Sequence, residues 1–179
     1  YDAALRITSD ETITVTATVK NNKNSEGFVV LPVEVLGTKY IVSSYNDATH
    51  YISKQYNNIV SLPSIVAITA AYDATEVKFK LGGNAQTSSA GGIKVYEEVS
   101  KILNSGEVWV ISTNEDDGDL SGSVISSSLP ISVVSSNQCA NIPLDNSPCN
   151  YLVEMEIPTQ VFGKKFIIPA LPDRKYNSV

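Results

Sequence analysis

Apolar and polar residues alternate along most of this chain, which is the pattern of a β-strand with one face in a core and one in water. The clearest run is ETITVTATVK, residues 11–20, in which apolar side chains at every second position are separated by threonines. Further runs are separated by Gly, Asn, Asp, Ser and Pro, which favour turns; they are GFVVLPV, TKYIVSSY, GEVWVIST, GSVISS, PISVVSS, NYLVEMEI and KKFIIPAL. The pattern predicts an all-β protein with many short strands.

Two segments carry more specific local predictions. Residues 64–81 contain two alternating runs around Tyr72-Asp73-Ala74-Thr75, and two such runs joined by a tight turn predict a β-hairpin. Residues 93–103, IKVYEEVSKIL, space their apolar side chains as one helical stripe. That segment is the only one whose spacing suits a helix, so we allow for at most one short helix.

An internal repeat relates the beginning of the chain to its end. Ile7, Ile13 and Val15 match Ile125, Ile131 and Val133, each pair 118 positions apart. A second set of matches lies 126 positions apart and joins LPVEVLGTKYIV to IPTQVFGKKFII through Pro32 and Pro158, Val35 and Val161, Gly37 and Gly163, Lys39 and Lys165, Ile41 and Ile167. The second copy is thus longer in the loop between the matched strands.

The repeat predicts tandem antiparallel β-sandwich-like units. Residues 1–120 form the first unit, and residues 121–179 begin a second unit that we expect to be incomplete. A β-propeller-like arrangement is the alternative, since strands of this size also group into four-stranded blades.

Composition and charge narrow the class of partner. The 179 residues are 42% apolar and 18% charged, with a net charge of -6 and scattered basic residues. Nucleic acids are held by clustered Lys and Arg, so nucleic-acid binding is excluded. No apolar run approaches the ~20 residues that a membrane helix needs, and we expect no membrane insertion. The chain begins at Tyr1 rather than Met, so we expect a processed protein or a fragment.

The only cysteines, Cys139 and Cys149, lie in the loop that is longer in the second copy. A bridge between them would remove roughly 2 to 3 kcal/mol of loop entropy from the unfolded chain. We therefore expect a disulfide, and with it an oxidising, extracellular compartment. Two free thiols or a metal pair are the alternatives, although no further Cys or His lies near enough in sequence to complete a zinc set.

Candidate catalytic groups are few. The single histidine, His50, lies in a polar stretch without the context of a nucleophile. Paired carboxylates can hydrolyse glycosides, and Glu154 and Glu156 share one strand face, but a solvent-facing acidic stripe explains them as well. We predict no catalytic residue, no cofactor and no metal site, and hence a protein that is not an enzyme.

Two loops could serve binding. The aromatic segment with Tyr45, His50, Tyr51 and Tyr56 is the best candidate for a recognition surface, because tyrosine offers a large contact area with few rotors. Ordinary tyrosines that cover the end of a sheet are the alternative. The acidic stretch NEDDGD, Asn114 to Asp119, suits either calcium or a turn that keeps a sheet edge soluble.

A family resemblance rests on the order of several motifs. GDLSGSVISSSLPISVVSSNQCANIP is followed by a second Cys and then by YLVEMEIPTQVFGKKFIIPAL. Together with SIVAITAAYDATEVKFKL and GFVVLPVEVLGTKYIVSSY, this series resembles the amino-terminal domain family of IgG Fc-binding protein. The resemblance implies a secreted, non-enzymatic binding or adhesion module of a mucus-type protein, whose partners are extracellular proteins or glycoproteins, or further copies of itself. A structural subunit of an extracellular assembly or filament is the alternative.

Overall fold

The computed structural model describes residues 4–20, 24–47, 62–82, 89–113, 118–142 and 149–168. Within them the chain forms strands and two 3-10 helices, so the prediction of an all-β fold is confirmed. In chain order the elements are β1 (Val15–Lys20), β2 (Ser25–Val30), η1 (Val33–Val35), β3 (Gly37–Ile41), β4 (Ser64–Ala70), β5 (Thr75–Lys80), β6 (Ser89–Ala90), β7 (Ile93–Lys94), β8 (Glu98–Leu103), β9 (Val108–Ser112), β10 (Val124–Ala140), β11 (Asn150–Met155) and η2 (Thr159–Val161).

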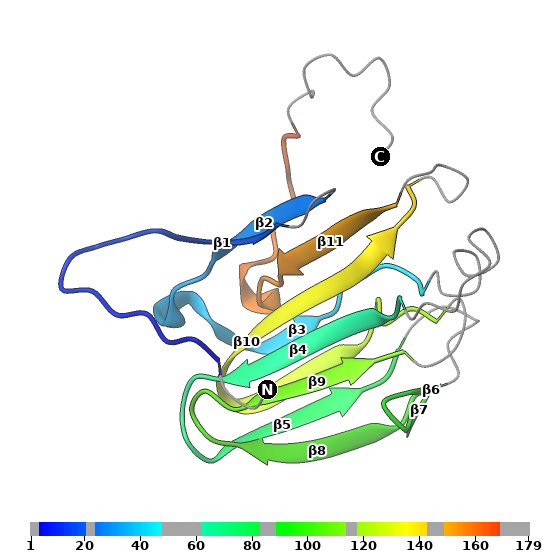
Figure 1. The fold of residues 1–179 in the computed structure, drawn as a ribbon. Helices are drawn as coiled ribbons and strands as arrows, with labels where there is room; N and C mark the ends of the chain where they lie inside the picture. The colour runs from blue at the N-terminus through cyan, green and yellow to red at the C-terminus, as the bar shows by residue number, and fades with distance from the viewer. Residues whose placement is uncertain are drawn as a thin grey trace.

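The long strand β10 is the centre of the main sheet (Figure 1). The order of this antiparallel sheet is β8-β5-β10-β4-β9, and β3 and β11 also pair with β10. The first half of β10 pairs with β5 and β3, and its second half pairs with β4 and β11. Ile131 stands where the two halves meet, opposite Gly37 of β3 and Ala70 of β4.

The predicted hairpin of residues 64–81 is wrong, although both of its strands exist. β4 and β5 do not pair with each other; each pairs with β10. Both strands run antiparallel to β10, β4 along its second half and β5 along its first, so the chain follows the bend of β10 between the two strands. At this bend the Ala71 N–H bonds the Pro130 carbonyl, and Ala74 has a φ of 53°. Alternation is the same in a hairpin and in a bent strand, so the sequence pattern did not distinguish them.

One core unites the two halves of the bent sheet. Alternate residues of β4 and β5 are buried, as a period of two requires. They pack with side chains of β10 into a single cluster that includes Val66, Ile68, Val77, Phe79, Ile125, Ile131 and Val133. The rings of Phe79 and Trp109 meet edge-to-face with centroids 6.2 Å apart, a favoured aromatic geometry.

The predicted helix of residues 93–103 is also wrong. This segment forms β7 and β8, and Tyr96 between them has a φ of 64°, which an α-helix cannot contain. The Tyr96 N–H bonds the Leu81 carbonyl and the Leu81 N–H bonds the Glu97 carbonyl. Pairing with the preceding segment therefore outweighs the local spacing. In the part of the chain that the structure describes, no helix is long and apolar enough to cross a membrane.

Candidate functional site: a groove beside Tyr45

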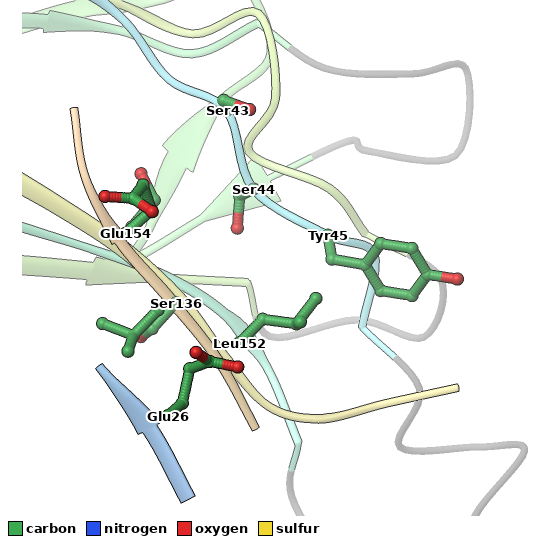
Figure 2. A pocket seen from close by; sticks show the side chains of 9 residues that line it. Glu26, Ser43, Ser44, Tyr45, Ser136, Leu152 and Glu154 are labelled. Carbon is green, nitrogen blue, oxygen red and sulfur yellow. The ribbon is translucent and has the colours of Figure 1, made fainter. Parts of the chain in front are cut away.

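A groove of about 340 Å³ lies where the chain leaves β3 and passes along β10 and β11. Figure 2 shows Tyr45 on one side, Glu26 and Glu154 on the other, and Leu152 between them. Its walls come from β2, the residues after β3, the second half of β10, and β11; the lining residues are Glu26, Ser43, Ser44, Tyr45, Ser135, Ser136, Leu152, Val153 and Glu154.

Serine hydroxyls fix the segment after β3. The Ser44 N–H donates to the Ser121 hydroxyl at 3.0 Å, and that hydroxyl donates back to the Ser44 carbonyl at 3.0 Å. The Ser44 and Ser64 hydroxyls are 2.7 Å apart. Because these bonds satisfy the backbone of a segment that is not a strand, its position does not depend on sheet pairing.

Tyr45 is held at both its ring and its backbone. Its hydroxyl donates to the Asn141 carbonyl at 2.7 Å. The buried amide of Asn137 donates to the Tyr45 and Asn46 carbonyls at 3.3 and 2.9 Å, and its oxygen accepts the Cys139 N–H at 2.9 Å. Burial, and secondarily the charge of Asp119, raise the pKa of Tyr45 above its usual value. The tyrosine is therefore neutral and fixed in direction.

A disulfide joins Cys139 to Cys149, whose Cα atoms are 5.0 Å apart. It connects the end of β10 to the residue before β11. Asn137, which holds the backbone of Tyr45, lies two residues before Cys139 and accepts its N–H. The disulfide thus closes the strand pair that supports the groove.

A buried carboxyl group lies behind the groove. Glu156 accepts the Ser43 N–H and the Ser135 hydroxyl, both at 2.6 Å. Burial raises the pKa of Glu156; the bonds from Ser135 and Ser43 oppose this rise, and the charge of Glu154 adds to it. Only Glu154 is exposed, so the interpretation of both glutamates as a solvent-facing stripe is wrong for Glu156. Glu156 lies just beyond the end of β11, where Met155 and Glu156 are both buried and the alternation ends.

The lining is acidic and aromatic. Among the residues that the structure describes, it includes two carboxylates, four serines and one tyrosine, and none of these lining residues is Lys or Arg. Elsewhere in the described ranges, no group of three or more His, Cys, Asp and Glu could hold a metal ion. The arrangement suits contact with a polar or basic segment of a partner.

The structure describes only part of the recognition surface that the sequence predicts. Tyr45 lines the groove, whereas His50, Tyr51 and Tyr56 lie outside the described residues, as do Asn114 to Asp117 of the acidic stretch. Sequence reasoning missed the serines and the burial of Glu156. The serines in the segments SSY and VVSSN were the sequence feature that could have indicated this site. Serine hydroxyls beside a buried carboxyl group are natural hydrogen-bond donors to it.

Comparison with known proteins identifies the family. A family model described as IgGFc binding protein matches residues 26–179. The "IgGFc-binding protein" of Homo sapiens is 25% identical over 171 residues, which cover 96% of this chain but only 3% of that protein. No solved structure matches the chain. Because the family model spans far more than half of the sequence, the chain belongs to the IgGFc binding protein family.

Proposed function

We propose that this chain is an extracellular, non-enzymatic module that binds proteins through the groove beside Tyr45. The family match and the name of the human relative support a binding role and make the Fc region of IgG the first partner to test. The disulfide supports an oxidising compartment. Fold alone does not carry function, so the proposal depends on the groove.

The fixed tyrosine carries the proposal. A ring whose hydroxyl and backbone are already bonded loses little conformational entropy when a partner covers it. Glu26 and Glu154 face it across the groove (Figure 2). The site therefore favours a partner loop that places an apolar side chain on Tyr45 and a Lys or Arg between the carboxylates.

Binding to purified IgG Fc, measured by biolayer interferometry, tests the proposal. We expect Tyr45→Ala to weaken binding by about tenfold or more, the usual effect of losing an aromatic hot spot. Tyr72→Ala, at an exposed tyrosine in the bend between β4 and β5, is the matched control and should leave Kd unchanged. Equal Kd values for the wild type and Tyr45→Ala would remove the groove from the interface.

Charge variants test the second feature of the groove. The double change Glu26→Gln with Glu154→Gln should weaken Fc binding and reduce its dependence on salt, because two attractive charges are lost. Glu98→Gln, at an exposed carboxylate on β8, should change neither. Purified protein should also show no turnover of glycosidic, ester or peptide substrates; a turnover abolished by Glu156→Gln would contradict the non-enzymatic proposal.

A further inference from the structure

The N-terminal arm, residues 4–13, exposes large apolar side chains without forming a strand. Leu5, Ile7 and Ile13 are 87%, 52% and 51% exposed. In Figure 1 the arm runs outside the sheet, as a blue trace, before it reaches β1. The Ala4 N–H bonds the carbonyl of Gly106 in the turn between β8 and β9. Apolar residues of this size normally lie in a core.

The sequence of the arm matches the buried first half of β10. Ile7, Ser9 and Ile13 correspond to Ile125, Ser127 and Ile131, each 118 positions later. In β10 both isoleucines are completely buried. Two charged residues of the arm, Asp10 and Glu11, correspond to Ser128 and Leu129, which are exposed in β10. These five positions of the arm thus suit the environment that β10 provides.

The strand pair that follows the arm, β1 with β2, also matches the strand pair β10 with β11, and the pairing register is the same. Thr16 pairs with Val29 in β1 and β2, and the residues 118 and 126 positions later, Val134 and Met155, pair in β10 and β11. The next pairs agree as well: Ala17 with Phe28 and Ser135 with Glu154, then Thr18 with Gly27 and Ser136 with Val153.

A 3-10 helix then follows each strand pair. Val33–Val35 and Thr159–Val161 are 126 positions apart, and each is preceded by an extended proline, with φ and ψ of −67° and 155° at Pro32 and −70° and 147° at Pro158. The structure therefore supports the sequence repeat with two independent features, a pairing register and a capped turn. The residues 118 positions after the arm form the first half of β10, at the centre of the main sheet, where Ile125 and Ile131 are buried.

We propose that the N-terminal arm serves as the central strand of another copy of this module, which precedes the present copy in the same polypeptide. The arm inserts antiparallel between the equivalents of β3 and β5 in that copy. Ile125 lies opposite Tyr40 and Phe79, so Ile7 takes this place in the preceding copy. The modules then share strands, and each is completed by the one that follows.

The segment after η2 agrees with this arrangement. Phe166 and Ile167 correspond to Tyr40 and Ile41 of β3, 126 positions earlier. β3 is held by β10, whereas residues 163–168 form no strand and expose Phe166, Ile167 and Ile168. In the proposed array this segment becomes the β3 of the next module, paired with the strand that follows it. Within one polypeptide, the connection from the last strand of one copy to the strand that completes it is short, since only residues 113–123 separate β9 from β10.

A two-copy chain tests the proposal. In this fusion, residues 4–123 form the first copy and are followed directly by residues 6–179 as the second copy. Arg6 of the second copy then takes the place of Val124 in the first. Hydrogen exchange read by mass spectrometry should show the amides of residues 7–13 in the second copy protected at least about 100-fold more than in the single chain. Equal exchange rates, or an unfolded first copy, would overturn the proposal.

A matched pair of substitutions separates insertion from incidental protection. Ile7→Asp with Ile13→Asp should leave the Tm of the single chain within about 1 °C, because both side chains are half exposed there. In the second copy of the fusion the same pair should lower the Tm of the first copy by several degrees. An unchanged Tm in both the single chain and the fusion would overturn the proposal. Protection of the arm in single chains that rises with concentration would assign it to another molecule instead and overturn the arrangement in cis.

Discussion

The hydroxyl of Tyr40 donates a 2.7 Å hydrogen bond to the carbonyl of Ile131, 91 positions away along the chain. The same hydroxyl accepts the N–H of Gly37 at 2.9 Å. Tyr40 is completely buried, and Ile131 is the residue at which β10 passes from β3 to β4. A single side chain therefore satisfies two backbone groups at the point where the main sheet bends.

Tyr40→Phe removes this hydroxyl and leaves both backbone groups without it. A buried donor or acceptor that loses its partner costs about 1–3 kcal/mol. We expect the free energy of unfolding, measured in urea, to fall by about that amount. Tyr72→Phe, at an exposed tyrosine, should change it by less than about 0.5 kcal/mol. Equal stability of both variants would show that Tyr40 acts through its ring alone.

Much of the strand content followed from the sequence, but the order of the strands did not. The alternation in ETITVTATVK and SIVAITA indicates β1 and β4 because a period of two is a local property. The pairing of β4 and β5 with the two halves of β10 is long-range. No local signal at Tyr72 to Thr75 reports it, since a tight turn permits either a reversal or a bend.

The candidate site was less predictable than the fold. Tyr45 stood out because aromatic residues in polar segments often make contacts. The burial of Glu156 was not predictable, since a glutamate on an alternating strand normally faces water. Its burial depends on donors from Ser43 and Ser135, which come from segments 113 and 21 positions away. Such a site exists only after the sheet has formed.

Glu156→Gln should alter the pH dependence of stability. The pKa of Glu156 in the folded state is raised above 4.5, mainly by burial. The folded state thus binds the proton more tightly than the unfolded state, so this group stabilises the protein below pH 4.5 and loses that contribution as the pH rises through the folded pKa. The wild type should gain stability relative to Glu156→Gln as the pH falls from 7, as measured by chemical denaturation. Glu98→Gln, an exposed control on β8, should leave the pH dependence of the wild type unchanged.

Loss of the disulfide should destabilise the protein. The bridge between Cys139 and Cys149 closes a loop with a sequence separation of 10, and the chain-entropy model gives roughly 2 to 3 kcal/mol for such a loop. The double variant Cys139→Ser with Cys149→Ser should lose about that much unfolding free energy. Non-reduced peptide mapping of the wild type should recover the two cysteines in one linked peptide pair. Two alkylatable thiols in protein from an oxidising compartment would contradict the bond.

Gly37→Ala should destabilise the contact between β3 and η2. A Cβ built on Gly37 would lie 2.5 Å from the Cβ of Pro158 and would also meet the amide of Gln160. Gln160 is exposed and can move, but Pro158 is buried, so the backbone must shift, at a cost of about 1–3 kcal/mol. Gly163 is the matched control because a Cβ there would meet only the ring of Phe166, at 3.0 Å, and that ring is exposed and free to turn. We expect denaturant unfolding to show a clear loss for Gly37→Ala and none for Gly163→Ala. Equal losses would mean that the close approach of Pro158 is not what requires glycine at position 37.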